Sequence, residues 1–307
     1  MTFTFKEKHL KRLCELNFFP VPTIGMIFFG LRGCLPTNVD NCNFSDEHTL
    51  VVQELNYTNP RCTLGQWLPE KGTIALFPGS TVPHRNYISS SIGKNGVGTN
   101  QLSTGFYLDY RKGIHKAGKP TAHEAFRQTQ GRPIRRTADD YDYQNDDKVD
   151  FINPYDDLHA AWCQSVNSIN YSSAGCQVII GYPKCPSPGH TSNIGPWKVF
   201  HDNAYGIAQQ SFPYVLMEGR DAERVAESED KNLSVRLRFG SENQLVSELQ
   251  TALRDEQFYE GEIDFRFQER TWKAVMNFQT ARFGPLADDG IVGPVTAEAL
   301  KIRWTEQ

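Results

Sequence analysis

The sequence of 307 residues contains no run of 18 apolar residues, so no membrane-spanning helix is predicted. It has little net charge: 32 Lys and Arg against 36 Asp and Glu give −4 at pH 7, and no global attraction to nucleic acid or acidic lipid is expected. The basic clusters at 6–12 and 132–136 are short, and we interpret them as solvated faces. A mean hydropathy of −0.51 indicates a globular protein with long polar loops.

Metal-binding signatures are also scarce. The seven cysteines include no C-x-x-C pair, which argues against a zinc ribbon, and their odd number leaves at least one thiol without an intramolecular partner. Most of the seven cysteines are predicted to be buried. Disulfides among Cys14, Cys34, Cys42 and Cys62 remain possible if the protein is exported. His115 and His123 could reach one metal ion, but no third ligand has a suitable spacing, so neither metal nor cofactor is predicted. The acidic run 139–147 lacks the glycine and closing glutamate of a calcium loop and is interpreted as solvated.

The N-terminal region lacks the unbroken apolar core of a signal peptide. Basic residues at 6–12 precede FFPVPTIGMIFFGL, but Pro20 and Pro22 interrupt the apolar stretch. We therefore expect a folded start in which 24–31, IGMIFFGL, is a buried strand.

Residues 1–220 are predicted to form one mostly β domain. Short apolar or alternating runs recur between segments rich in Gly, Pro, Asn and Ser, which is typical of strands and turns. Helices are expected only at 121–128 and 197–209. Polar residues at 221–235 predict a linker, which precedes a helical unit at 236–307. The predicted class is therefore α+β. The expected strands are 24–31, 73–77, 104–110, 177–181 and 214–217.

The last 70 residues follow a helical period. Val246, Leu249 and Leu253 recur at i, i+3 and i+7, which predicts a helix at 242–255. The same spacing predicts a second helix at 269–281, and Pro294 suits the first turn of a third. The unit is therefore a small three-helix bundle.

This unit resembles the peptidoglycan-binding domain of many cell-wall enzymes, through four motifs in order: VSELQTAL at 246–253, FYEGEID at 258–264, TWKAVMNFQ at 271–279 and DGIVGPVTAEAL at 289–300. The resemblance implies an anchor for glycan and stem peptide. Most of the motif residues hold the helices together, and Tyr259, Asp264 and Asp289 are candidates for binding. Phe265 and Gln268 stand where the family usually has glycine.

A different kind of segment, DLHAAWCQSVNSINYSSAGCQV at 157–178, contains His159 and Cys176 but no apolar period after Trp162. An imidazole that takes the proton of a thiol creates a nucleophile. If the chain forms a hairpin between the two, they could face each other. Gly175 would allow a tight turn, and N–H groups at Gly175 and Cys176 could point at an oxyanion. A structural thiol, and a disulfide between Cys163 and Cys176, are the alternatives.

His159 followed by Ser173-Ala174-Gly175-Cys176 resembles the motif of L,D-transpeptidases, β-rich cysteine acyltransferases of bacterial cell walls. The resemblance implies that Cys176 is the nucleophile and His159 its base. It also implies that the Ala160 carbonyl holds the imidazole and that Ser173 supports the turn. The sequence departs from the family at Ala174, where His is frequent, and at 177–178, where Arg or Asn is usual after the cysteine.

Together these features predict an enzyme that acts on peptidoglycan stem peptides through a Cys176 thioester, as transpeptidase, carboxypeptidase or endopeptidase. Two alternatives stay open: a non-catalytic wall-binding or phage structural protein with a relic site, and a lysin or antibacterial effector. Peptidoglycan is the predicted partner, with no nucleic acid, and the cell wall or periplasm the expected place of action. The acceptor, the oligomeric state, the export route and the role of 1–140 are left open.

Overall fold

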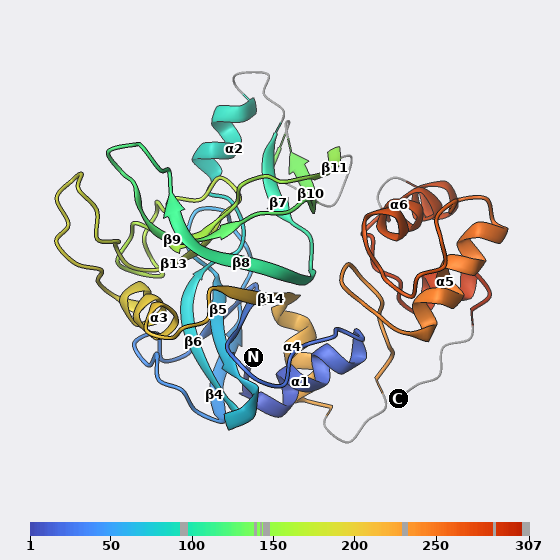
Figure 1. Ribbon diagram of the computed structural model, residues 1–307, viewed down its shortest axis with the longest axis horizontal. Helices are drawn as coiled ribbons and strands as arrows, with labels where there is room; N and C mark the ends of the chain where they lie inside the picture. Colours follow the sequence, from blue (N-terminus) through green and yellow to red (C-terminus); the bar gives the residue numbers. More distant parts are fainter. Residues whose placement is uncertain are drawn as a thin grey trace.

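Figure 1 shows the computed structural model, which describes residues 1–92, 98–137, 140–141, 143, 148–228, 233–284 and 287–302. The fold is mixed α+β, with a closed barrel in a mostly β N-terminal part and a helical C-terminal region, which confirms the predicted class. Within these ranges no helix is both long and apolar enough to cross a bilayer. Of the acidic run, Asp139, Asp142, Asp146 and Asp147 lie outside the described residues.

The strands are β1 (Thr2–Lys6), β2 (Ile27–Arg32), β3 (Cys34–Pro36), β4 (Glu47–Val52), β5 (Cys62–Leu68), β6 (Thr73–Ser80), β7 (Thr99–Leu102), β8 (Gly105–His115), β9 (His123–Gln128), β10 (Arg132–Thr137), β11 (Lys148–Ile152), β12 (Leu158–Ala160), β13 (Gln177–Ile179) and β14 (Ser211–Glu218). The helices are α1 (Glu7–Leu16), α2 (Arg85–Ile92), α3 (Pro196–Tyr205), α4 (Gly219–Ala226), α5 (Gln244–Asp255), α6 (Glu269–Phe283) and α7 (Pro294–Ala299), and a 3₁₀ turn spans Pro69–Lys71.

Eight strands close the barrel in the order β12-β13-β6-β5-β2-β14-β8-β9. Each of the five predicted strands lies on one of these, and β2 is buried along its whole length, as expected for IGMIFFGL. Stacked and edge-on rings fill the interior: Phe28 lies 4.4 Å from Phe212 and 4.8 Å from Phe126, centroid to centroid. Such pairs add stability beyond the area that they bury, so the barrel is a packed core.

The segment 121–128 is a strand and not the predicted helix. Its helix-forming residues are overruled by pairing, because β9 forms an antiparallel hairpin with β8 in which His123 lies opposite His115. Phe126 then points into the barrel core. Context decides between helix and strand when a short segment can satisfy both.

Two smaller sheets flank the barrel, in the orders β1-β4-β3 and β11-β10-β7. The basic cluster on β10 is not the solvated face that the sequence suggested, because each arginine pairs with an aspartate. Arg132 pairs with Asp109 and is 2% exposed, and Arg136 Nε lies 2.9 Å from Asp150. These guanidinium groups are therefore occupied within the fold.

Helices α1 and α4 pack together below the barrel (Figure 1). On α1, Leu10, Leu13 and Cys14 face the core while Lys8 and Lys11 are exposed, so the basic cluster at 6–12 is indeed a solvated face. On α4, Ala222 and Val225 join the same apolar cluster. The segment predicted as a linker at 221–235 therefore begins inside a packed helix.

The three C-terminal helices occupy the predicted segments, and their turns share one design. Gln250 on α5 donates its amide to Asp264 and Thr271, and Gln279 on α6 donates to Asp289 and Thr296. Each glutamine oxygen also accepts a backbone N–H from the same turn. The two buried amides thus fix two equivalent turns.

The equivalence explains one of the two departures from the family pattern, Phe265. Phe265 follows Asp264 as Gly290 follows Asp289, and both residues have a left-handed backbone, with φ of 65° and 70°. A Cβ at Gly290 would lie 2.5 Å from Trp272 Nε1, whereas Phe265 is 45% exposed. The first turn therefore tolerates a side chain that the second cannot accommodate.

The helical unit packs against the β part through several contacts. Phe239 stacks on Tyr107 at 5.3 Å, and Arg238 donates to Thr104 at 2.9 Å. Arg135 on β10 binds the backbone oxygen of Asp288. Apolar residues of both parts belong to one continuous cluster, so the two parts form a shared core.

Candidate active site

Two adjacent strands bring His159 and Cys176 together. Strands β12 and β13 are parallel neighbours, with His159 opposite Val178. Cys176 stands two residues before Val178, and side chains alternate along a strand, so its side chain is on the same face as that of His159. The predicted hairpin is therefore wrong in detail: residues 161–176 form a crossover that returns the chain in parallel.

The site lies on the outer face of the barrel. Leu158 and Ala160, the neighbours of His159, belong to the main core, while Val178 belongs to a separate small cluster with Cys163 and Cys176. The alternation of β12 thus separates the residues that fill the barrel from those that build the site.

Hydrogen bonds define the state of the His159 ring. Its Nδ1 lies 2.8 Å from the Ala160 carbonyl oxygen, the contact that the family resemblance implies. Because a carbonyl only accepts, Nδ1 carries the proton and Nε2 carries the lone pair. That Nε2 is buried and has no hydrogen-bond partner in the described part of the chain. This nitrogen can therefore accept a proton, and no described residue donates a hydrogen bond to it.

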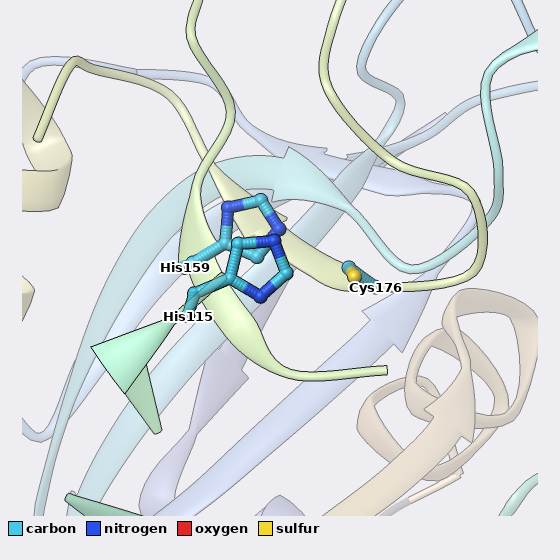
Figure 2. Close-up of side chains that lie close together, drawn as sticks. All are labelled: His115, His159 and Cys176. Carbon is cyan, nitrogen blue, oxygen red and sulfur yellow. The ribbon is translucent and has the colours of Figure 1, made fainter. Parts of the chain in front are cut away.

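A second histidine, which the sequence did not assign to this site, lies on the first. The His115 ring stacks on His159 with centroids 4.2 Å apart and planes 18° apart, beside Cys176 (Figure 2). One ring nitrogen from each histidine and the Cys176 sulfur lie within 4.8 Å of one another. The three groups could share a proton, a substrate atom or a cation.

Asp157 orients His115. Its Oδ2 lies 2.8 Å from His115 Nδ1, while Oδ1 accepts the Gln128 N–H at 3.2 Å and Arg127 Nε at 3.1 Å. The carboxylate is 2% exposed and fully engaged. Asp157 could have been identified from the sequence, because it stands two residues before His159 and shares its face. His115 could not be assigned from spacing, because it is 44 residues away.

The turn before Cys176 is held by Ser173 and Gly175. Ser173 Oγ donates to the Cys176 carbonyl at 2.8 Å and accepts the Gly175 N–H at 3.2 Å. Gly175 has φ of +132°, and a Cβ there would lie 2.6 Å from Asp156 Oδ2. Glycine is therefore required. The Gly175 N–H is already used, so in this structure it does not point at an oxyanion as predicted.

Burial keeps the site neutral. It raises the pKa of the Cys176 thiol well above its usual range, helped by the Asp156 and Asp157 carboxylates. It lowers the pKa of His159 well below its usual range, helped by the two neighbouring imidazoles, and lowers that of His123 to about 4. A thiolate–imidazolium pair is therefore not preformed at neutral pH.

The thiol is less open than expected. Cys176 is 7% exposed and His159 is 1% exposed, in place of the solvent-open cleft that a nucleophile suggests. Cys163 packs in the same small cluster but forms no disulfide with Cys176, and all seven cysteines are free and buried. The expectation that most cysteines are buried is confirmed.

The binding candidates of the helical unit have structural roles. Asp264 Oδ1 accepts Gln250 Nε2 at 2.7 Å, and Asp289 Oδ1 accepts Gln279 Nε2 at 2.8 Å. Tyr259 is 4% exposed and donates to the Glu262 carbonyl at 2.6 Å. Each of the three side chains therefore holds a turn.

Comparison with known proteins gives one result, which concerns the helical unit. Among curated proteins and solved structures, nothing matches this chain. Residues 242–300 match the family described as putative peptidoglycan binding domain, which supports peptidoglycan as a partner and association with the cell wall.

Proposed function

We propose that the β part is a cysteine acyltransferase or peptidase that acts on peptidoglycan stem peptides, with Cys176 as nucleophile and His159 as its base. The observation that carries the proposal is the adjacency of the two side chains on neighbouring parallel strands, with the His159 lone pair unpartnered. The match of 242–300 to a peptidoglycan-binding family supplies the substrate class.

In the proposed reaction, the Cys176 sulfur attacks a stem-peptide carbonyl carbon while the thiol proton passes to His159 Nε2. The imidazolium then gives this proton to the departing amine, and a thioester remains. Attack of a second amine gives a cross-link, and attack of water gives a shortened stem. Because burial holds both groups neutral, proton transfer accompanies attack and does not precede it.

Three groups support the two reacting residues. The Ala160 carbonyl keeps the proton of the resting imidazole on Nδ1. The Ser173 hydroxyl fixes the carbonyl of Cys176 and so the direction of the turn. With the Gly175 N–H engaged by Ser173, the proposed oxyanion donor is the N–H of Cys176.

The test is digestion of purified sacculi, with the products resolved by mass. Wild type and the matched control Cys163→Ala, which lacks a neighbouring buried thiol, should change the muropeptides equally, and Cys176→Ala and His159→Ala should not change them. New cross-links identify a transpeptidase, and shortened stems identify a hydrolase. An unchanged profile with wild type contradicts the proposal.

The burial of Cys176 favours a second candidate, a wall-binding protein with a relic site. An iodoacetamide probe near neutral pH separates the two. Because His159 takes the thiol proton during attack, the enzyme requires that Cys176 react faster than the other six thiols despite its raised pKa, and that His159→Ala remove the difference. Equal reactivity of all seven thiols supports the relic. Either candidate could reach the wall through cell lysis, as a lysin does, or through a dedicated secretion machine, as an antibacterial effector does.

Wall binding has its own test. Because Phe239 and Trp272 pack against the β part, deletion of 236–307 would expose core surface and confuse binding with unfolding. The full chain should therefore be sedimented with sacculi and, as a control, with cellulose. Retention on sacculi alone is expected, and equal recovery from both would contradict the proposed partner.

A further inference from the structure

Four consecutive strands of the barrel each contribute one group to the same outer face. His115 ends β8, His123 begins β9, His159 lies on β12, and Cys176 immediately precedes β13. The three imidazole rings lie within 5.3 Å of one another, centroid to centroid. All four groups are at most 8% exposed. So dense a collection of nitrogen and sulfur exceeds what one acid–base pair needs.

Three of these groups converge at the spacing of ligands. One nitrogen of His115, one of His159 and the sulfur of Cys176 lie within 4.8 Å of one another (Figure 2). In a tetrahedral zinc site, ligand atoms of these types are about 3.3–3.6 Å apart, given the usual metal–nitrogen and metal–sulfur distances. Binding would therefore require the three ligand atoms to move closer together.

The outer hydrogen bonds have the pattern that orients metal-binding histidines. His115 Nδ1 is held by the Asp157 carboxylate and His159 Nδ1 by the Ala160 carbonyl, each at 2.8 Å. Such partners hold the ring in place and leave Nε2 as the ligand atom. Asp157 is itself held by Arg127 and by the Gln128 N–H, so it cannot readily turn away.

An independent observation also indicates a missing ligand. His159 Nε2 is buried, and no hydrogen-bond partner meets it in the part of the chain that the structure describes. The residue is 1% exposed, so bulk water does not replace the partner. Buried polar atoms are nearly always satisfied, and an exception calls for an explanation. A cation would satisfy this nitrogen and would also offset the Asp157 carboxylate, which opposes a free thiolate.

We propose that His115, His159 and Cys176 bind one divalent cation of the Zn²⁺ type, with a water molecule in the fourth position. Two imidazoles and a thiolate suit a borderline-soft ion and not Mg²⁺ or Ca²⁺, which take oxygen ligands. On binding, the Cys176 thiol loses its proton to solvent and forms the sulfur–metal bond. The site does not depend on the proposed acyl transfer, but the two exclude each other because both use the Cys176 sulfur.

Cobalt is the probe for the test, because its complexes with thiolate absorb light while those of Zn²⁺ do not. The full-length protein is stripped with a chelator and titrated with Co²⁺. We expect a thiolate-to-cobalt charge-transfer band that saturates at one equivalent and disappears when Zn²⁺ is added. The Cys176→Ala variant should lack the band, and His115→Ala or His159→Ala should weaken Co²⁺ binding at least tenfold. The milder Asp157→Asn should weaken it about 10–100-fold through loss of the outer carboxylate.

The matched control is Cys163→Ala, which should titrate like wild type; circular dichroism of each stripped variant establishes that it is folded. The absence of a band in wild type, its persistence in Cys176→Ala, or indifference to both histidine variants overturns the proposal. Muropeptide analysis in chelator is separate: a protein that binds Co²⁺ but forms no products fails only as an enzyme, and one that forms products without binding Co²⁺ fails only as a metal site.

Discussion

Two sets of buried polar atoms, one in the turns of the helical unit and one on the outer face of the barrel, are paired in opposite ways. In the helical unit, the amides of Gln250 and Gln279 each meet partners through both nitrogen and oxygen. On the barrel, Nε2 of His123 and of His159 is buried without a partner in the described residues. An unsatisfied buried group costs about 1–3 kcal/mol. The paired glutamine amides stabilise the fold, whereas the unpaired histidine nitrogens can accept a hydrogen bond or a metal ion from a substrate or ligand.

The largest effect should come from breaking the satisfied networks. Gln250→Met or Gln279→Met keeps the shape of the side chain but removes one of the donors to Asp264 or Asp289 and leaves a buried backbone N–H of the turn without its acceptor. Each should therefore lower the free energy of unfolding by about 3–5 kcal/mol. Denaturant unfolding measures it. The exposed Gln244→Ala on the same helix as Gln250 should change it by less than about 0.5 kcal/mol.

The same kind of polar-to-apolar change in the barrel site should be mild. His123→Phe removes an imidazole whose Nε2 has no partner in the described chain and retains a ring of similar size. We expect a change of about 1 kcal/mol or less. A loss of unfolding free energy as large as that expected for Gln250→Met would contradict this contrast, because it would mean that polar contacts hold the site together.

The turn before Cys176 should give an intermediate effect, larger than that of His123→Phe. Gly175→Ala places a methyl group 2.6 Å from Asp156 Oδ2 on a left-handed backbone, which should cost about 2–3 kcal/mol and displace Cys176. Gly118→Ala is the matched control, since φ there is +79° but nothing lies within 4 Å of the new Cβ. If the two variants have equal free energies of unfolding, backbone strain alone, without the contact with Asp156, would account for the loss at Gly175.

Asp156 should make stability depend on pH. Burial raises its pKa to about 8 from an unfolded value of 3.8, so between these values the folded state holds the proton more tightly. Stability from this group is therefore full below pH 3.8 and is lost as pH rises toward 8, at up to about 1.4 kcal/mol per unit. Relative to Asp156→Asn, wild type should lose stability over that window and not beyond it. Parallel pH profiles of the two proteins would contradict the assignment.

A small effect is also expected at the junction of the two parts. Arg135→Ala removes a partly buried ion pair with Asp288 and a hydrogen bond to its carbonyl. The Arg135–Asp288 pair is mostly buried but long, at 3.8 Å, and Asp288 keeps Thr280 as a partner, so we expect a loss of about 1–2 kcal/mol. Thermal unfolding should shift slightly while remaining a single transition, because the apolar core is shared. Two separated transitions would contradict a shared core.

The sequence predicted five of the fourteen described strands and the three C-terminal helices, where the pattern is local, but it missed α1 and α2. The 3.6-residue period located α5 and α6, and Pro294 marked the start of α7. The apolar run at 24–31 located β2. The segment 121–128 failed because its composition suits a helix while the cross-strand partner at 105–115 makes it a strand. Pairing between distant residues carries no local signal.

For the candidate active site, the sequence motif predicted part of the geometry. His159 and Cys176 were brought together by a motif, and the Ala160 contact followed from the resemblance; their catalytic roles stay predictions. His115 could not be found, because a third ligand was sought near it in sequence and its neighbours lie 44 and 61 residues onward. The roles of Asp264 and Asp289 were missed since an exposed-looking aspartate in a turn can equally accept from a buried amide.

The proposed function requires that His159 make Cys176 a nucleophile toward wall peptides. Its most direct test is the intact mass of the chelator-treated protein after incubation with a purified stem peptide and an acid quench. We expect an acyl adduct on Cys176 that is absent from Cys176→Ala and strongly reduced in His159→Ala. A wild-type protein without the adduct, or an adduct that persists when Cys176 is replaced, would contradict it.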